Sequence, residues 1–188
     1  MYFKVVENCL APEFCDYLIS LGERTGFVES TLNGVPARDF RRSLSCKLDL
    51  LQASSGLSQN HLDQFKQAIM AHLPKIYKGR TLVDATTNSL NILKYTPGDF
   101  FKRHTDGSWQ ENGATSLITC QIYLNSLGVE QGGSTTFYKD DGSVYLDYVP
   151  KAGSVVFFDH MWLHEGSLMN HGNKYAFRVS AMYSHCSQ

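Results

Sequence analysis

Short runs of strand-forming residues, each ended by a turn signal, follow one another through the second half of the chain. The runs are 89–95, 100–104, 115–124, 134–138, 144–149, 154–158 and 174–183. Pairs such as Pro97-Gly98 and Asp141-Gly142 separate them, and these residue types favour tight turns. Short strands at this spacing are typical of an all-β sandwich or barrel, so we expect a β core of this kind.

Two amphipathic helical patterns come before these strands. The first begins with Pro12 in its first turn and stops at Gly26. The second covers 61–73, with Asn60 as the expected N-cap and Pro74 as the stop. Helices followed by strands indicate an α+β, mainly β fold, in which the N-terminal helices pack on one face of a jelly-roll core.

The first part of the chain also holds strand patterns. Residues 2–6 are rich in β formers, and residues 27–32 and 39–48 flank Asn33-Gly34, a strong hairpin signal. We therefore expect one strand at 2–6 and a hairpin in which 27–32 pairs with 39–48. At 188 residues the chain is most simply one domain, 1–188, with helical support over 1–84 and the jelly-roll core over 85–185.

Charge and apolar runs exclude several partner classes. Charged residues make up 19% of the chain and the net charge is -1, so there is no broad electrostatic footprint for nucleic acid, and none is expected as a partner. No apolar run approaches the roughly 18 residues that a membrane span needs, and the first residues lack a long apolar segment. No membrane association is expected.

The cysteines favour a reducing compartment. There are five of them, an odd number with no C-x-x-C pair and no zinc-type spacing. They are Cys9, Cys15, Cys46, Cys120 and Cys186. Isolated cysteines of this kind behave as small buried hydrophobes, which predicts a cytoplasmic protein.

The pair His104-x-Asp106 is the first candidate for chemistry. On an extended segment side chains alternate between faces, so both would point the same way and could hold one ion. A second imidazole downstream would complete the two-histidine, one-carboxylate triad of non-haem Fe(II). His160 and His164 are both candidates, and spacing alone does not choose between them.

Simpler readings compete with this one. A second H-x-D occurs at His61-x-Asp63, but on a helix residues two apart do not share a face. His160 and His164, four apart, could form a helical zinc pair, yet no Glu follows His160 as the H-E-x-x-H pattern demands. A zinc hydrolase is therefore the poorer fit.

The neighbours of the triad resemble a known family. The matching pieces are Tyr95-x-x-Gly98-x-x-Phe101-x-x-His104-x-Asp106, Thr119-x-x-x-Tyr123-Leu124-Asn125, Gly132-Gly133-Ser134-Thr135-x-Phe137, Pro150-Lys151-x-Gly153-x-x-x-x-Phe158 and His164-Glu165-Gly166 with Gly172-Asn173-Lys174-Tyr175 and Arg178. In their order and spacing they resemble the iron- and 2-oxoglutarate-dependent dioxygenases, specifically the prolyl 4-hydroxylase-like branch. The resemblance implies a double-stranded β-helix, another name for the jelly-roll core.

The resemblance also implies roles for individual residues. His104, Asp106 and His164, the histidine followed by Glu-Gly, would be the catalytic metal ligands. Lys174 would bind the far carboxylate of 2-oxoglutarate. A cation is needed there because burial of a dicarboxylate removes it from water. The remaining co-substrate residues would be Tyr123, Tyr95 and, four residues after Lys174 on the same strand, Arg178.

Two further positions bear on the substrate. Phe101 stands where several prolyl hydroxylases carry Tyr, so that hydroxyl is absent here. Arg41-Arg42-Ser43 resembles an Arg-x-Ser strand that touches substrate in peptide prolyl hydroxylases, although a solvated basic strand fits the pattern equally well.

The implied activity is hydroxylation of an aliphatic C–H bond with Fe(II), 2-oxoglutarate and O2, and with ascorbate in a supporting role. Because Asp106 supplies a carboxylate, hydroxylation is expected rather than the halogenation of related enzymes. The substrate would be a prolyl residue of a peptide, an amino acid or a small metabolite. The alternatives are a cupin-type metal enzyme that does not use 2-oxoglutarate and a non-catalytic jelly-roll binding module.

Overall fold

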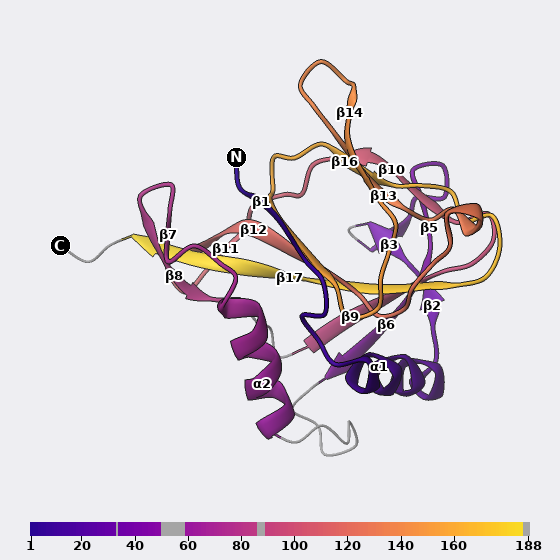
Figure 1. Ribbon diagram of the computed structural model, residues 1–188, viewed down its shortest axis with the longest axis horizontal. Coiled ribbons are helices and arrows are strands. Elements are labelled where there is room, and N and C mark those ends of the chain that lie inside the picture. Colours follow the sequence, from indigo (N-terminus) through magenta and orange to yellow (C-terminus); the bar gives the residue numbers. More distant parts are fainter. Residues whose placement is uncertain (33, 50–58, 86–88, 186–188) are drawn as a thin grey trace.

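Two antiparallel sheets face each other in the computed structural model, which describes residues 1–32, 34–49, 59–85 and 89–185 (Figure 1). The larger sheet of the described residues runs in the order β1 (Phe3–Val6), β15 (Val155–Asp159), β12 (Ala114–Tyr123), β17 (Lys174–His185), β9 (Ser89–Tyr95), β6 (Leu44–Asp49) and β2 (Val28–Glu29). At its margin, β11 (Gln110–Glu111) pairs with β12, β8 (Arg80–Asp84) pairs with β17, and β7 (Ile76–Tyr77) pairs with β8.

The smaller sheet carries much of the site. Its order is β14 (Val144–Tyr148), β13 (Thr135–Tyr138), β16 (His164–Gly166), β10 (Phe100–His104) and β5 (Arg41–Arg42). A separate short hairpin joins β3 (Thr31–Leu32) to β4 (Val35–Pro36), and a 3-10 turn, η2, covers Val129–Gln131. These strands and their partners in the larger sheet form the predicted double-stranded β-helix, and the α+β, mainly β class is confirmed.

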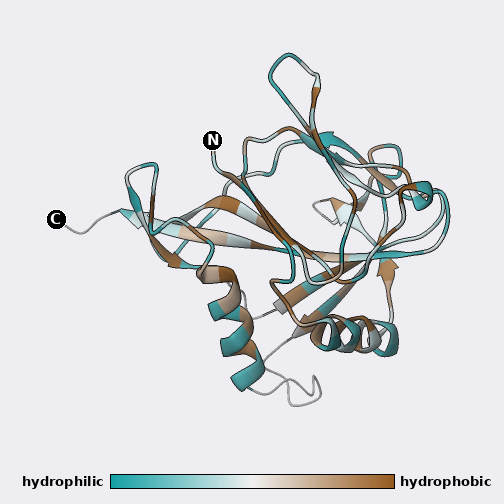
Figure 2. Cartoon of the chain, viewed as in Figure 1, coloured by the Kyte–Doolittle hydropathy of each residue, from teal (hydrophilic) through white to brown (hydrophobic). Residues whose placement is uncertain are grey.

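Two helices cover the outer face of the larger sheet, as predicted. They are α1 (Pro12–Thr25) and α2 (Gln59–Met70), and Figure 2 shows polar turns of α2 on its outer side. Leu18 of α1 and Ile69 of α2 are fully buried in one cluster with Ile122 and Phe177 from the sheet. Neither α1 nor α2 combines the length and the apolar character of a membrane span, and no other helix of the described residues does so.

The period of two along β12 divides its side chains between two environments. Ile118, Cys120 and Ile122 belong to the core beneath the helices. Tyr123 belongs to a second cluster between the two sheets, and Thr119 shares its face. This alternation gives one strand both a structural face and a face that looks into the interior of the β-helix.

Several predicted boundaries were right and others were wrong. The strands at 89–95 and 100–104 and the helix from Pro12 are as expected. The second helix covers 59–70 rather than 61–73, so Asn60 lies inside it and is not its N-cap. The unpredicted strands include β8 and β16. β16 is only three residues long, so it shows no periodicity in the sequence.

The predicted pairing of 27–32 with 39–48 is confirmed in part, because Val28–Glu29 of β2 pairs with the first two residues of β6. Close to the turn, β3 pairs instead with β4 in a short hairpin, and Asn33 lies outside the described residues. Residues 39–48 divide at Ser43: β5 joins the smaller sheet beside β10, whereas β6 joins the larger sheet beside β9. The chain therefore crosses between the sheets at Ser43, which is buried.

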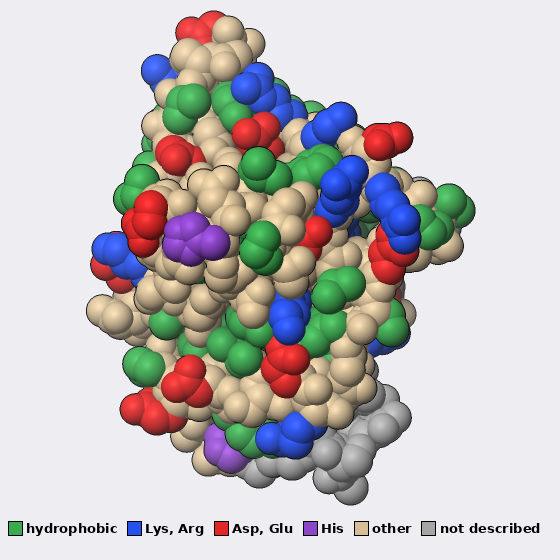
Figure 3. All heavy atoms as spheres, turned by 90° about the vertical axis from the view of Figure 1, so that its right-hand side faces the viewer, with side chains coloured by type: hydrophobic (Ala, Val, Ile, Leu, Met, Phe, Trp, Pro, Cys, Tyr) green, Lys and Arg blue, Asp and Glu red, His purple; other side chains and the backbone are tan. Residues whose placement is uncertain are grey.

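Acidic and basic side chains are interspersed on the face drawn in Figure 3. Described surface ion pairs include Arg38–Glu29 at 2.5 Å and Lys94–Glu23 at 2.7 Å. Exposed pairs of this kind contribute little to stability, so the fold depends mainly on its two apolar clusters.

The turn before β15 gives a test of the packing. Gly153 has a φ of +73°, and a Cβ at this position would lie 2.2 Å from the carbonyl oxygen of Leu10. Gly153→Ala should lower the free energy of unfolding by about 3 kcal/mol, since it adds a backbone clash to the cost of positive φ. Gly142 has a φ of +81° and open space around it. Gly142→Ala should therefore lower the free energy of unfolding by only about 1 kcal/mol. Urea denaturation followed by circular dichroism would measure both, and equal losses would contradict this packing.

Candidate active site

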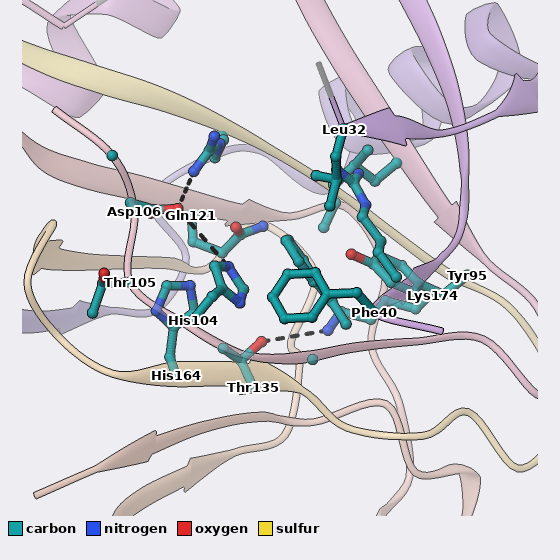
Figure 4. Close-up of a pocket in the computed structure, with 17 residues that line it drawn as sticks. Leu32, Phe40, Tyr95, His104, Thr105, Asp106, Gln121, Thr135, His164 and Lys174 are labelled. Atoms are coloured by element: carbon teal, nitrogen blue, oxygen red, sulfur yellow. Dashed lines mark hydrogen bonds and ion pairs between the residues drawn. The ribbon is translucent and has the colours of Figure 1, made fainter. Parts of the chain in front are cut away.

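A cavity of about 390 Å³ opens between the two sheets, and side chains of β5, β9, β10, β12, β16 and β17 line it (Figure 4). It holds His104, Asp106, His164 and Lys174 together. Residues that are far apart in the sequence, from Leu32 to Arg178, thus line one interior space.

Three predicted ligands converge on one point. His104 ends β10 and His164 begins β16, and the two residues are direct partners in the antiparallel pairing of these strands. Asp106 lies two residues after His104 in the sequence. One ligand atom from each of the three side chains lies within 4.8 Å of the other two. Asp106 and His164 are buried, at 6% and 7% exposure. Two imidazoles and a carboxylate at such distances could hold one metal ion.

Backbone carbonyls orient both imidazoles. The Nδ1 atom of His104 lies 2.7 Å from the carbonyl oxygen of Lys102, and Nδ1 of His164 lies 2.9 Å from that of Trp162. A carbonyl oxygen only accepts, so each Nδ1 must carry the hydrogen that it donates. The Nε2 lone pairs are then left for a metal, the arrangement usual for histidine ligands.

Asp106 does not lie on β10, as the period-two argument assumed, but in the loop after it. Its backbone N–H donates to the carbonyl oxygen of His160 at 2.9 Å. The Thr119 hydroxyl donates to one carboxylate oxygen at 2.5 Å, and the Arg178 guanidinium contacts the other. The carboxylate is therefore directed by a loop contact and two side chains.

The protonation states suit metal binding. Burial, followed by the neighbouring His164, lowers the pKa of His104 to about 4, and burial also lowers the pKa of His164. Burial raises the pKa of Asp106, but Arg178 and the other neighbours together outweigh it, so this pKa lies below its ordinary value. At neutral pH the site presents two neutral imidazoles and a carboxylate, the donor set of non-haem Fe(II).

Lys174 lies in the same cavity as an unpaired cation. It is 4% exposed, and its Nζ donates to the carbonyl oxygen of Gly133 at 2.7 Å and to Thr135 Oγ1 at 3.4 Å. It forms no ion pair with any residue that the structure describes. Burial lowers the pKa of Lys174 to about 7. A carboxylate delivered by a ligand would offset this desolvation.

Two tyrosines flank this ammonium group. The ring centroids of Tyr95 and Tyr123 lie 5.3 Å and 5.5 Å from Nζ of Lys174. The Tyr123 hydroxyl is buried and has no hydrogen-bond partner among the described residues. A buried donor without an acceptor, beside an unpaired cation, fits the distal carboxylate of 2-oxoglutarate.

The structure shows the contacts of Arg178 and His160, whose roles the sequence did not decide. The Arg178 side chain is 53% exposed and pairs with Asp106, away from the buried ammonium group of Lys174. His160 is buried, at 4% exposure, and its carbonyl oxygen rather than its ring contacts Asp106. Thr119 had no assigned role, although its place four residues before Tyr123 puts both on the inward face of β12.

The turn that leads into His164 is anchored to the N-terminal strand. The carbonyl oxygen of Tyr2 accepts hydrogen bonds from the backbone N–H of Asp159 at 3.0 Å and from Nε1 of Trp162 at 3.2 Å. Asp159 is buried, and its carboxylate accepts from Tyr77 at 2.5 Å and pairs with Lys78 at 2.6 Å. Elements far apart in the sequence therefore hold this turn.

Removal of single ligands tests the metal centre. His104→Ala, Asp106→Ala and His164→Ala should each weaken Mn(II) binding at least about 100-fold, because the loss of an outer-shell partner alone commonly costs 10- to 100-fold. Isothermal titration calorimetry would measure the affinity. His171→Ala, at an exposed position, is the matched control and should bind normally. Unchanged affinity in the triad variants would show that the ion is held elsewhere.

Comparisons with known proteins agree with this geometry. Residues 90–182 match the family model described as the 2OG-Fe(II) oxygenase superfamily. No curated protein sequence matches the chain.

Several solved structures share the fold. A prolyl-4-hydroxylase from Pseudomonas putida matches with a TM-score of 0.71 at 21% identity, covering 95% of this chain and 91% of that one. A Trichoplax adhaerens prolyl hydroxylase, in complex with a hypoxia inducible factor peptide fragment, matches at 0.76 and 16% identity, covering 99% and 87%. A viral collagen prolyl hydroxylase from Paramecium Bursaria Chlorella virus-1, as its 2OG complex, matches at 0.66 and 17% identity, covering 98% and 97%.

At these identities the solved structures establish the fold, and the family model assigns the family. The matched segment contains all three candidate metal ligands and Lys174. The chain therefore belongs to the 2OG-Fe(II) oxygenase superfamily and is an oxygenase that depends on Fe(II), 2-oxoglutarate and O2.

Proposed function

We propose that this oxygenase hydroxylates an aliphatic C–H bond, with His104, Asp106 and His164 as metal ligands and Lys174 as the anchor of 2-oxoglutarate. The observation that carries the proposal is the buried, unpaired Lys174 in the cavity of the triad. Fe(II), when bound with 2-oxoglutarate, supplies the activation of O2 that ends in succinate, CO2 and a hydroxylated product.

The residues of the chain bind and orient the reactants. The Nε2 atoms of His104 and His164 and the carboxylate of Asp106 would bind the metal from one side, which leaves the cavity side for the other reactants. Thr119 keeps the Asp106 carboxylate turned toward the centre. Lys174, together with the Tyr123 hydroxyl, would fix the far end of 2-oxoglutarate and hence the direction of its reacting end.

Aromatic side chains restrict water around the triad. The Phe101 ring stacks on His104 with centroids 3.7 Å apart, and the Phe137 ring lies 5.7 Å from that of His164. Phe158 packs against His164 from β15. An apolar wall of this kind strengthens electrostatic contacts inside the cavity and limits side reactions with water.

The rival functions meet specific objections. A cupin-type enzyme without 2-oxoglutarate would have no use for a buried unpaired ammonium group, which is costly to keep. A non-catalytic module would have no need for three oriented ligands. The substrate we propose is a prolyl residue, an amino acid or a small metabolite, and the Trichoplax relative, which binds a peptide, supports the first of these.

The described thiols suit a reducing compartment. Cys9, Cys15, Cys46 and Cys120 are all unpaired, and burial raises the pKa of Cys15 to about 11. Buried thiols of raised pKa are inert and need no oxidising environment. These thiols support our proposal that the protein is cytoplasmic.

Succinate release tests the reaction. Protein loaded with Fe(II) should convert 2-oxoglutarate and O2 to succinate in the presence of a pool of amino acids and prolyl peptides. Asp106→Ala should reduce this rate by about 100-fold or more, since a metal ligand is lost, and His171→Ala should not change it. Absence of turnover together with absence of 2-oxoglutarate binding would refute the proposed function. If the Lys174→Ala variant still oxidised a substrate and released no succinate, the result would favour a cupin-type enzyme.

The affinity for 2-oxoglutarate should depend on pH through Lys174. The carboxylate needs the ammonium form, which predominates below the pKa of about 7. Affinity should therefore be constant below about pH 7 and fall by up to about tenfold per pH unit above it. His104, with a pKa of about 4, stays neutral in this range.

Lys174→Arg provides the matched comparison, because a guanidinium group does not titrate below about pH 12. Calorimetric titration of Mn(II)-loaded protein with 2-oxoglutarate should show a pH-independent affinity for this variant between about pH 6 and pH 9. The same slope in both proteins would mean that another group governs binding.

A further inference from the structure

A third cationic side chain of the cavity, besides Lys174 and Arg178, has no role in the chemistry described so far. Arg41 lies on β5, the edge strand of the smaller sheet, and lines the same cavity as the triad. It forms no ion pair with any described residue, and the only acidic side chain of the described cavity wall is Asp106, which Arg178 already occupies. Arg41 is therefore an unneutralised guanidinium group beside the reacting centre.

The Arg41 side chain is held in place by a buried hydrogen-bond chain. Its Nε donates to the Ser43 hydroxyl at 3.0 Å, and Ser43 donates to the Ser30 hydroxyl at 2.9 Å. Ser43 and Ser30 are buried, at 5% and 6% exposure. The Tyr95 hydroxyl also lies against the guanidinium group. Ser43 and Tyr95 together engage two of its five N–H donors, so donors on the terminal nitrogens are left for a ligand. A guanidinium group fixed in this way matches a carboxylate with two parallel hydrogen bonds.

Arg41 also stands at a defined position relative to the metal ligands. Its guanidinium lies over the Phe101 ring, 4.9 Å from the centroid, and Phe101 stacks in turn on His104. Arg41 and Phe101 are direct partners in the pairing of β5 with β10. Only the Phe101 ring thus separates Arg41 from the proposed ligand His104. A compact substrate could therefore bind Arg41 with one end and reach the metal centre with the other.

Charge and size further define that substrate. Fe(II) and 2-oxoglutarate carry equal and opposite charges, and Asp106 balances Arg178, so the loaded cavity keeps an excess of positive charge. A cavity of about 390 Å³ that also holds 2-oxoglutarate admits only a small reacting group. The apolar side chains of Leu32 and Phe40 also line the cavity, and Phe40 is 38% exposed (Figure 4).

We propose that Arg41 binds the carboxylate of the substrate, and that the substrate is a compact apolar acid, either a free amino acid or the C-terminal residue of a peptide. This inference rests on the proposed function and adds the substrate class. The apolar part would pack on Leu32 and Phe40 while the carboxylate pairs with Arg41.

Ligand-observed proton NMR with Mn(II)-loaded protein tests this without turnover, since the paramagnetic ion broadens the signals of anything bound near it. The probes are L-proline, L-leucine and their N-acetyl derivatives, each compared with its carboxamide, in the presence of saturating 2-oxoglutarate. We expect wild-type protein to broaden acids and not amides. Broadening of the free amino acids alone would identify a free acid as the source, and broadening of the N-acetyl acids would identify a peptide C-terminus.

Variants of neighbouring arginines make the comparison specific. Arg41→Gln should weaken binding of the acids about tenfold or more, and Arg41→Lys should weaken it less, because charge remains while the two-pronged contact is lost. Arg42→Gln is the control: Arg42 is exposed, lies outside the cavity wall and donates to the carbonyl oxygen of Arg38. It should bind the acids as wild type does.

Each contrary result has a distinct meaning. Equal broadening of acids and amides, no broadening of any acid, or full binding by Arg41→Gln would overturn the role of Arg41. Weaker binding of 2-oxoglutarate itself by Arg41→Gln would overturn it too, since Arg41 would then belong to the co-substrate. By contrast, failure of wild-type protein to broaden 2-oxoglutarate would contradict the proposed function.

Discussion

The pairing of β10 with β16 is the interaction on which the site depends. It places His104 opposite His164 across an antiparallel ladder, so backbone hydrogen bonds bring two of the proposed ligands together. The carbonyl oxygens of Lys102, on β10, and of Trp162, in the turn before β16, fix the orientations of both rings. Geometry set by backbone in this way tolerates much change elsewhere in the sequence, which agrees with a shared fold at 21% identity or less.

The interior of the β-helix combines cations with an apolar surround. Lys174 sits between two tyrosine rings, and Arg41 lies over a phenylalanine ring. Such positions are unfavourable for an unpaired charge and favourable for one that meets an anion, which supports the proposed binding roles of the two groups. The β-helix supplies the apolar surround, and the charged side chains supply the polar groups that would orient a ligand.

Much of the fold could be predicted from the sequence because long strands and amphipathic helices carry strong periodic signals. The strands β9 and β10 and the helix α1 are of this kind. The three residues of β16 are too few to show a period, and the crossing at Ser43 depends on two sheets that compete for one segment. Likewise the three candidate metal ligands could be named from motif and resemblance, whereas the contact of Arg178 with Asp106 arises only from tertiary structure.

The carbonyl oxygen of Tyr2, just before β1, has an effect that extends beyond the N-terminal segment. It accepts two hydrogen bonds from the turn that precedes His164, while the carbonyl oxygen of His160 in that turn holds the backbone of Asp106. These contacts connect the position of β1 to that of the proposed metal ligands. A metal ion held by those ligands would stabilise the state in which β1 is docked, because a ligand stabilises the state that binds it.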